Sequence, residues 1–302
     1  MDIISKKKWY FLLSGLVIIP GFLSLWIFGL KLSIDFTGGS LLEVKIANHK
    51  SEIRNQELQD VIVGTGVEIS SIQQSGDKTY LLRMKAIDKN QEEKVKRAIS
   101  DKFGSTEELR FETVGPTIGK EISINALKAL ALSSILIVIY IAWSFRKVPK
   151  PASSWRFGVC AIVALLHDVL VVVGVFSLLG QFKGVEVDSL FVTALLTVIG
   201  FSVHDTIVVF DRIRENLRTM IGAPFAQIVN ESIIQTLNRS LNTSLTVVFV
   251  LVALLLFGGG TIKWFVVALL VGIISGTYSS IFNASPLLVV WEEWSQKRTK
   301  KV

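Results

Sequence analysis

Hydrophobic residues in this chain are gathered into six long blocks, with polar stretches between them. The blocks cover Trp9–Phe28, Ser123–Phe145, Phe157–Leu179, Leu190–Phe210, Leu241–Phe257 and Trp264–Val290. Each block is close to the roughly 20 residues that an α-helix needs to cross the hydrocarbon core of a bilayer. The pattern predicts an α-helical membrane protein with six transmembrane helices. A composition that is 50% hydrophobic agrees with that class.

The longest polar stretch, Lys31–Glu121, separates the first two blocks and has the patterning of a soluble domain. Apolar residues alternate with polar ones in Leu42–Ile46, as in a strand, and recur at helical spacing in Val95–Phe103. Along Lys31–Glu121, segments with strand-like alternation and segments with helical spacing predict the order β-α-β-β-α-β. This order is a ferredoxin-like α+β arrangement. Asn90 and Glu93 have capping-box spacing and predict the start of the second helix.

The net charge of +7 raises the question of a nucleic-acid partner, but the distribution of the charge argues against one. Basic residues cluster in four segments, Lys6–Lys8, Arg146–Arg156, Arg212–Arg218 and Lys297–Lys301. With six crossings all four segments fall on the same side, whereas the loops Gly180–Ser189 and Gly258–Lys263 on the other side carry few charges. This positive-inside pattern places both termini in the cytosol. The basic residues are then explained by topology and by attraction to anionic membrane lipids, and no nucleic acid is expected.

These observations predict four segments. Residues 1–30 form a tail and the first transmembrane helix, and residues 31–122 form an extracytoplasmic α+β domain. Residues 123–290 form a five-helix transmembrane region with cytosolic loops, and residues 291–302 form a basic cytosolic tail. The start of the chain resembles a signal peptide, but its apolar part is too long and no A-x-A site follows, so we interpret it as an uncleaved anchor. With Cys160 as the single cysteine, no disulfide can form within the chain.

Two glycine-containing joints bracket the predicted α+β domain. Gly38 and Gly39 precede it, and Gly115 and Pro116 follow it. They are either simple turns between domain and membrane or paired hinges about which the domain moves as a body. The domain itself shows neither a metal-ligand cluster nor a nucleophile arrangement, and a G-x-x-x-x-G-K-[ST] phosphate loop is absent from the sequence. We therefore expect no metal, no cofactor and no catalytic residue.

The most informative polar residue inside an apolar block is Asp205. A charge near the centre of a bilayer costs about 2.5–3.5 kcal/mol on insertion scales, so an acid at this depth is a functional candidate, and protons or ions are its expected ligands. His204 precedes it and shares a helix face with Thr193 and Thr197, whereas Asp205 faces about 100° away. His204 is either a proton relay or a hydrogen-bond partner between helices.

Other polar residues in the apolar blocks allow more than one interpretation. His167 and Asp168, near the middle of the third block, either handle protons or cross-link helices. Arg239 opens the fifth block with Thr243 behind it, and it is either a positive-inside residue or a bundle-facing one. Before it, Ala223–Gln235 has the spacing of an amphipathic helix at the cytosolic interface. In the sixth block Gly272, Gly276 and Ser280 are spaced by four, which predicts close helix packing.

Several motifs together carry a resemblance to a known family. They are S-I-D-F-T-G-G (33–39), V-G-P-T-I-G-K-E (114–121), A-L-L-H-D-V (164–169), I-G-F-S-V-H-D-T-I-V-V-F-D-R-I-R-E-N (199–216), Q-T-L-N-R-S-L-N-T-S (235–244) and G-T-Y-S-S-I-F-N-A-S-P-L (276–287). The chain resembles the smaller, SecF-type members of the SecD/SecF family, within the resistance-nodulation-division superfamily. The resemblance places the family's proton-linked acid at Asp205 and its transmembrane arginine at Arg239. One departure is His204, where the family usually has Asn.

The resemblance implies a non-enzymatic subunit that uses proton motive force to promote preprotein export. Its implied partners are SecD, the SecYEG channel and the translocating preprotein, with SecD completing a pseudo-symmetric twelve-span unit. The predicted proton pathway contains Asp205 and Arg239, which the resemblance implies, and His204, Asp168, His167 and Thr243, which the pattern of polar residues adds. The implied location is the bacterial cytoplasmic membrane, with a thylakoid membrane as a possibility. The alternatives are half of a small-molecule proton antiporter of the same superfamily and a non-transporting scaffold for the Sec channel.

Overall fold

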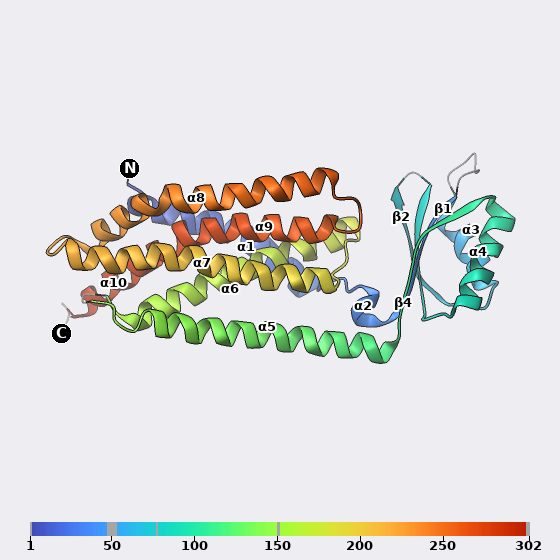
Figure 1. Ribbon diagram of the computed structural model, residues 1–302, viewed down its shortest axis with the longest axis horizontal. Helices are drawn as coiled ribbons and strands as arrows, with labels where there is room; N and C mark the ends of the chain where they lie inside the picture. The colour runs from blue at the N-terminus through green and yellow to red at the C-terminus, as the bar shows by residue number, and fades with distance from the viewer. Residues whose placement is uncertain (1, 47–52, 77, 150–151, 300–302) are drawn as a thin grey trace. The chain divides into compact units, whose positions relative to one another are not determined.

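The chain folds into two compact units, one formed by Met1–Lys31 with Lys128–Val302 and the other by Leu32–Leu127 (Figure 1). The computed structural model describes residues 2–46, 53–76, 78–149 and 152–299. Within these residues, six helical stretches are long and apolar enough to cross a membrane, which confirms the six predicted spans. Their helices are α1 (Lys7–Phe28), α5 (Pro116–Ser144), α6 (Ser154–Lys183), α7 (Ser189–Thr219), α8 (Phe225–Phe257), and α9 (Lys263–Ser279) continued by α10 (Ser285–Thr299).

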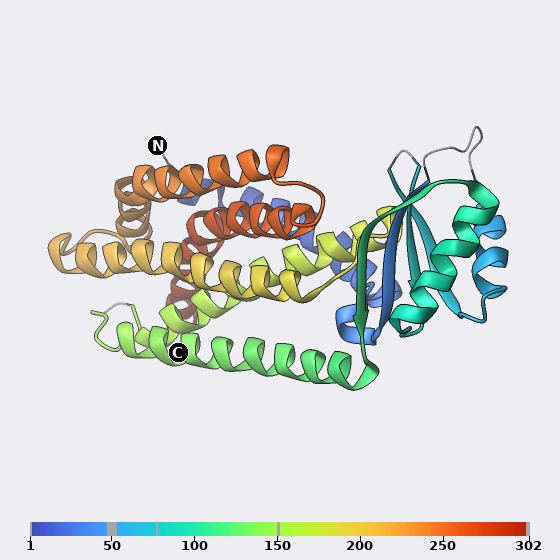
Figure 2. The same ribbon diagram turned by 45° about the vertical axis from the view of Figure 1, so that its right-hand side comes forward.

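Helix α9 is the centre of the helical unit. It packs against α6, α7 and α8, and in both views it runs between α8 and α7 (Figures 1 and 2). Small residues permit these approaches, as the small-residue row predicts. A Cβ atom on Gly272 would lie 2.1 Å from Val198 Cγ2, and a Cβ atom on Gly174 of α6 would lie 2.7 Å from the Cα of Gly21 in α1. The helices are therefore close enough for short polar side chains to reach one another.

The last span changes its helical geometry partway along. Between α9 and α10, the segment η2 (Ser280–Ala284) is a π-helix. Pro286 follows two residues later and has no N–H to donate back into the previous turn. The hydroxyl of Ser285 donates to the Ser280 carbonyl at 3.2 Å, five residues back. π-helical segments are often found at functional sites.

One predicted element is wrong. Ala223–Gln235 does not form a separate interfacial helix, because most of it is the first part of the continuous helix α8. Its apolar residues Ile228, Val229 and Ile233 are buried in the hydrophobic core of the helical unit together with Ile3 and Ile4. The start of the chain supplies this cover: its 3-10 turn η1 (Ile4–Lys6) packs against α8, and the Ile3 N–H donates to Asn230 Oδ1 at 2.8 Å.

The second unit contains a four-stranded antiparallel sheet with two helices on one face (Figure 1). Its elements follow in the predicted order: β1 (Gly39–Ile46), α3 (Asn55–Val63), β2 (Ile69–Gly76), β3 (Thr79–Met84), α4 (Lys89–Phe103) and β4 (Thr106–Val114). The strand order in the sheet is β2-β3-β1-β4. The core between sheet and helices includes Leu42, Val44, Leu82, Val95 and Ile99.

The predicted start of α4 is wrong by two residues. Asp88 rather than Asn90 is the N-cap, and the capping box is completed by Gln91 rather than Glu93. The Asp88 carboxylate accepts the Gln91 N–H at 2.8 Å, and the Gln91 side chain accepts the Asp88 N–H at 3.1 Å. A carboxylate at this position both accepts a free N–H and interacts favourably with the helix dipole, which favours the earlier start.

The two glycine-containing joints lie side by side in the second unit. Gly39 at the start of β1 pairs with Val114 at the end of β4, and α5 begins at Pro116. Gly38 has φ 73° and a Cβ atom there would lie 2.9 Å from the Cα of Pro116. Before them, the short helix α2 (Ile34–Thr37) is capped by Ser33. Glycine is thus needed at Gly38 for both its backbone conformation and this close approach.

Candidate functional site

Asp168 on α6 and Asp205 on α7 are carboxylates buried in the middle of two apolar helices. Asp168 is fully buried and lies next to α7 and α9. Its Oδ2 accepts the hydroxyls of Ser202 at 2.5 Å and Ser279 at 2.7 Å, and its Oδ1 accepts the hydroxyl of Ser275 at 2.8 Å. The neighbouring His167 Nδ1 lies 3.0 Å from Oδ1.

This arrangement makes Asp168 a cross-link between three helices. Ser202 belongs to α7, whereas Ser275 and Ser279 belong to α9. Both carboxylate oxygens are used, so the ionised group receives hydrogen bonds that offset part of its loss of water. The geometry agrees with the helix-linking interpretation of Asp168, and it leaves His167 available for further chemistry.

The second buried carboxylate, Asp205 on α7, is held much more loosely. It is only 1% exposed. Its Oδ2 accepts the hydroxyls of Ser244 from α8 and Thr277 from α9, both at 3.3 Å. Those two hydroxyls are only 2.6 Å apart and also bond to each other. Among the residues the structure describes, none donates to Oδ1. The Asp205 anion therefore has little compensation for its burial, which suits a group that gains and loses a proton.

The sequence of α9 explains how one helix serves both carboxylates. Ser275 and Ser279 are four residues apart, so they lie on the same face of the helix. Thr277 is midway between them and points about 200° away from each at 100° per residue. Ser275 and Ser279 consequently reach Asp168 on α6, and Thr277 reaches Asp205 on α7.

Three other predicted site residues lie on the outside of the helical unit. His204 on α7 is exposed, in the same stripe as Thr193 and Thr197. Arg239 and Thr243 on α8 are exposed as well. Arg239 forms no ion pair with any described residue, so this structure does not join it to Asp205. We call Thr193, Thr197, His204, Arg239 and Thr243 the exposed stripe. Polar and charged side chains at membrane depth need a partner or water.

The hydroxyl groups around the two carboxylates were not predicted. They are Ser202, Ser244, Ser275, Thr277 and Ser279. The one signal in the sequence was the spacing of four between Ser275 and Ser279, parallel to the small-residue row at Gly272, Gly276 and Ser280. Across the described ranges, no group of three or more His, Cys, Asp or Glu is placed to hold a metal ion.

Known proteins resemble this chain over its whole length. Residues 94–294 match the family described as "Protein export membrane protein SecD/SecF, C-terminal", and residues 23–47 match the "SecD/SecF GG Motif". The chain is 51% identical over 304 residues to the "Protein translocase subunit SecF" of Thermobaculum terrenum, covering 97% of this chain and 94% of that protein. It is 38% identical over 306 residues to the "Protein translocase subunit SecDF" of Bacillus subtilis, covering 99% of this chain and 39% of that protein.

A solved structure shares the fold. The crystal structure of SecDF, a translocon-associated membrane protein from Thermus thermophilus, matches with a TM-score of 0.83 and 33% identity. The match covers 97% of this chain and 39% of that one. The shared fold, the sequence identity and the family match agree with one another, and the chain belongs to the SecD/SecF family of protein-export membrane proteins.

Proposed function

We propose that this chain is a SecF-type accessory subunit of the Sec translocase and that it uses proton motive force, together with SecD, to promote preprotein export. The observation that carries the proposal is the coordination of Asp205. This carboxylate is buried at membrane depth, accepts two long hydrogen bonds on one oxygen, and lies beside a stripe of exposed polar residues. Names of relatives support the Sec assignment, and the chemistry of Asp205 supports the proton-linked mechanism.

In this mechanism Asp205 takes up a proton in one state and releases it in another. Ser244 and Thr277 donate to the ionised form, and Arg239 approaches it when the helices rearrange. His204 and Thr243 extend the pathway along the exposed stripe, and His167 with Asp168 forms a second polar site on the other side of α9. The ferredoxin-like domain moves about Gly38, Gly39, Gly115 and Pro116 to act on the preprotein. No residue has a catalytic role.

The exposed stripe is also the proposed contact with SecD. The Bacillus subtilis relative named SecDF is much longer, and this chain matches 39% of it, which supports a partner half of similar design. The SecYEG channel, the translocating preprotein and membrane lipids are the further partners. Both termini face the cytosol and the ferredoxin-like domain faces outward. The host membrane is the cytoplasmic membrane, or a thylakoid membrane where the cell has one.

The test is substitution of Asp205 in vesicles that contain the chain with SecD and the channel. Asp205→Asn keeps the size of the side chain but cannot titrate, so it should assemble normally and lose proton-dependent export and proton flux. Asp205→Glu should retain part of both activities, and His204→Asn most of them. The matched control is Asp211→Asn on the same helix, because Asp211 is exposed and pairs with Arg214.

The alternatives give different results in the same vesicles. Wild-type export and proton flux in Asp205→Asn would reject the carrier mechanism and favour a scaffold. Loss of proton flux with normal export would favour a proton antiporter that carries another solute. Loss of both activities in the Asp211→Asn control would show that the assay responds to general damage rather than to proton carriage.

A further inference from the structure

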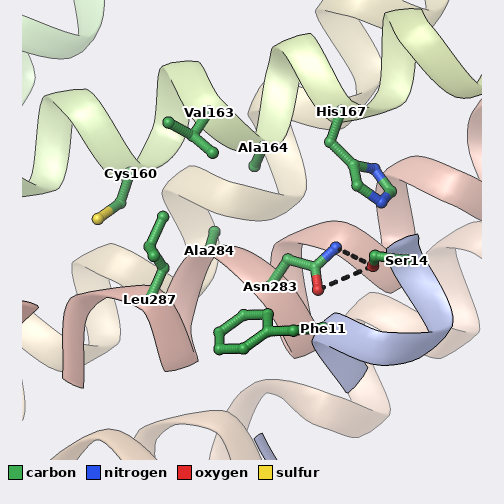
Figure 3. A pocket seen from close by; sticks show the side chains of 9 residues that line it. All are labelled: Phe11, Ser14, Cys160, Val163, Ala164, His167, Asn283, Ala284 and Leu287. Carbon is green, nitrogen blue, oxygen red and sulfur yellow. Dashed lines mark hydrogen bonds between the residues drawn. The ribbon is translucent and has the colours of Figure 1, made fainter. Parts of the chain in front are cut away.

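A cavity of about 160 Å³ lies between α1 and α6 and is closed on one side by η2 and α10 (Figure 3). Its lining includes Phe11 of α1, Val163 and Ala164 of α6, Ala284 of η2 and Leu287 of α10. The cavity opens toward the outside of the helical unit, where Val163 is 45% exposed and Phe11 is half-buried. None of its lining residues belongs to α7 or α8, which carry the exposed stripe, so the cavity is a separate feature of the surface that faces the bilayer.

The packing of α1 against α6 explains why a cavity forms at this position. The two helices meet closely at Gly21 and Gly174, and three residues further along each helix the hydroxyls of Ser24 and Ser177 bond at 2.8 Å. Seven residues before the glycines, two turns toward the start of both helices, Ser14 and His167 take their places. Side chains then stand between the two backbones, and the cavity lies at this level.

The surface that the cavity presents is apolar, although three of its lining residues are polar. Asn283 Nδ2 donates to Ser14 Oγ at 2.8 Å, and Ser14 Oγ donates to Asn283 Oδ1 at 3.1 Å, so these two side chains bond to each other. His167 Nδ1 lies 3.0 Å from Asp168 Oδ1, and His167 Nε2 is buried. An apolar cavity stays dry and binds apolar molecules. In a bilayer the apolar group that is available is the acyl chain of a lipid.

Basic residues lie one turn before the cavity on both helices. Lys7 is four residues before Phe11 in α1, and Arg156 is four residues before Cys160 in α6, so each shares a helix face with a residue of the cavity lining. Lys8, next to Lys7, is exposed. We call Lys7, Lys8 and Arg156 the basic rim. Under the proposed topology the basic rim is on the cytosolic side of the cavity.

Helix α10 holds two cations of the basic rim in place and leaves them able to bind a further anion. The Lys7 ammonium donates to Glu293 at 2.6 Å, and Arg156 pairs with Glu292. An ammonium has three N–H donors and a guanidinium has five, so both cations keep donors beyond these pairs. Among the described residues Lys8 forms no ion pair. The basic rim therefore attracts an anion such as a phosphate.

Exposed indole rings mark the depth of the basic rim. Trp9 is 71% exposed and follows Lys8, whereas Trp155 is 72% exposed and precedes Arg156. Tryptophan is enriched at the level of the lipid headgroups. The basic rim is therefore at the depth of the phosphates, and the cavity begins one turn deeper, about 5 Å, where the acyl chains begin.

We propose that the cavity holds one acyl chain of an anionic phospholipid and that the phosphate of the same lipid lies at the basic rim. The chain packs on Phe11, Val163 and Leu287, which replaces contact with loosely ordered lipid by contact with fixed side chains. The proposal deepens the lipid partnership proposed above. Its assignment to the cytosolic leaflet rests on the proposed topology, whereas binding of the lipid does not depend on proton-linked export.

Photoreactive lipids test the site in the full chain reconstituted in lipid nanodiscs. One probe is phosphatidylglycerol, which is anionic, and the other is phosphatidylcholine, which has no net charge, each with a diazirine near the middle of one acyl chain. Mass spectrometry identifies the cross-linked peptides. Phosphatidylglycerol should label the peptides that contain Phe11 and Val163 more strongly than phosphatidylcholine does, whereas both probes should label the exposed Leu136 of α5 equally.

Competition identifies the source of the anion. Excess unlabelled phosphatidylglycerol should displace the probe from the cavity, and inorganic phosphate in solution should not. Equal labelling of the cavity by the two probes, absence of cavity labelling, or displacement by inorganic phosphate would overturn the proposal.

Filling the cavity tests the position of the acyl chain. Ala164→Leu places a larger side chain in the cavity from α6, so labelling of Phe11 should be lost while labelling of Leu136 is unchanged. The matched control is Ala131→Leu, the same change at an exposed position of α5, and it should label as the wild type does. If Ala164→Leu is not monodisperse, Ala284→Leu fills the cavity from η2. Labelling of Phe11 that persists in a folded, filled variant would refute the assignment.

A substitution that conserves net charge tests the basic rim. Lys7→Gln with Glu293→Gln removes the ion pair, and it should lower cavity labelling by phosphatidylglycerol about fivefold, the effect of one cation close to an anionic headgroup. Lys8→Gln breaks no described contact and should act in the same direction. Lys297→Gln removes an exposed cation of α10 outside the basic rim and should have a smaller effect. An effect of Lys297→Gln as large as that of the double variant would show general attraction to the surface and overturn the site.

The variant Asp205→Asn separates this site from the export mechanism. Its cavity should bind the phosphatidylglycerol probe as the wild type does, even where export is lost, because no residue of the cavity lining contacts Asp205 among the bonds the structure describes. Loss of export in Asp205→Asn therefore does not bear on the lipid site. Loss of probe binding in that variant would contradict a lipid site that is independent of Asp205.

Discussion

Asp168 and Asp205 are both buried on neighbouring helices, yet Asp168 accepts hydrogen bonds on both carboxylate oxygens, whereas Asp205 accepts them from the described part of the chain on Oδ2 alone. The bonds to Asp168 from hydroxyl groups measure 2.5–2.8 Å, and those to Asp205 measure 3.3 Å. A carboxylate with several short bonds is a rigid link, and one with few long bonds can change its protonation state and its partners with less loss. Asp168 is therefore suited to link helices, and Asp205 is suited to change its protonation state.

This difference predicts that substitution of Asp168 lowers the stability more than substitution of Asp205. Asp168→Ala removes the acceptor for three serine hydroxyls and leaves them buried, so it should lower the free energy of unfolding by about 3 kcal/mol. Asp205→Asn should change it by less than about 1 kcal/mol, because only two long bonds are altered. Thermal unfolding of the purified variants in the same detergent measures both.

A double substitution provides the control for Asp168. Ser275→Ala with Ser279→Ala removes the hydroxyls of α9 but keeps the carboxylate, and it should be almost as damaging as Asp168→Ala. Adding Asp168→Ala to that background should then cost less than it does alone. Equal losses for Asp168→Ala and Asp205→Asn would show that bond length and number do not distinguish the two sites.

The contact between α1 and α6 gives a second prediction. Gly174→Ala would place its Cβ 2.7 Å from the Cα of Gly21, and backbone cannot move aside without separating the helices. We expect a loss of about 1–3 kcal/mol. Gly158→Ala on the same helix is the matched control, because nothing lies within 4 Å of its Cβ. That control should be neutral or slightly stabilising, since alanine is the better helix former.

The unfolding midpoints of Gly174→Ala and Gly158→Ala measure this difference in stability. The amount of each variant inserted in the membrane is a second measurement. A Gly174→Ala protein as stable as Gly158→Ala would mean that α1 and α6 are farther apart in the membrane than in this structure.

The joint at Gly38 gives a third prediction, in which two effects can be separated. Gly38 and Gly66 both have positive φ, 73° and 83°, so alanine is strained at each by about 1 kcal/mol. At Gly38 the new Cβ would also lie 2.9 Å from the Cα of Pro116, whereas at Gly66 the space is open. Gly38→Ala should therefore be clearly the more damaging, measured by hydrogen exchange of β1 and β4 in the full-length protein.

If Gly38→Ala and Gly66→Ala prove equal, positive φ is the whole requirement and close packing of the two joints is not important. If Gly38→Ala leaves the sheet stable but lowers export, the hinge interpretation of the joints gains support.

The six spans were predictable because a lipid-facing helix needs a continuous apolar run, which is visible without knowledge of its neighbours. Asp205 and Asp168 were found for the same reason, since an acid within such a run is conspicuous. Alternation likewise predicted the strands of the second unit. Each of these features depends on residues that are close together in the sequence.

The donors to the two carboxylates could not be predicted in this way. Ser275 lies 107 residues from Asp168 along the chain, and only the packing of α9 between its neighbours brings them together. Serine and threonine are also common in membrane helices without a special role. Arg239 was predicted to open the fifth apolar block, and the helix that carries it, α8, begins earlier, at Phe225.

Topology is the fourth prediction. In a Cys160→Ser background, a cysteine at the exposed position of Glu93 in α4 should react with an impermeant reagent added outside the cell. A cysteine at Lys297 in α10 should react only after the membrane is opened. Interfacial tryptophans support the membrane placement of the helical unit, because Trp9, Trp26 and Trp155 are all exposed, as is usual at the two bilayer surfaces. Labelling of both sites from outside would exclude this topology.

The last prediction concerns pH and the second unit, where Lys96 pairs with both Glu92 and Glu108. Hydrogen bonds from the Lys96 ammonium lower the pKa of the Glu108 carboxyl below its usual 4.5. Hydrogen bonds to Glu108 and Glu92 raise the pKa of Lys96 above its usual 10.5. The Glu108 contribution to stability is present above about pH 4.5 and is lost as the pH falls through its lowered pKa. The Lys96 contribution is present below about pH 10.5 and is lost as the pH rises through its raised pKa.

Between those limits the stability of the second unit should not change with the titration of this cluster, and hydrogen exchange of α4 in the full-length protein measures it. Glu108→Gln should lower the free energy of unfolding by about 1 kcal/mol or less at pH 7, because the pair is partly exposed. It should also reduce the loss of stability that occurs as the pH falls below about 4.5. Lys96→Met should cost about 3 kcal/mol, because Glu92 is nearly fully buried and loses its cation. Adding Glu92→Gln should restore much of that loss. If Glu108→Gln loses as much stability at low pH as the wild type, or if Glu92→Gln does not restore the stability of Lys96→Met, the cluster does not control the acid stability of this unit.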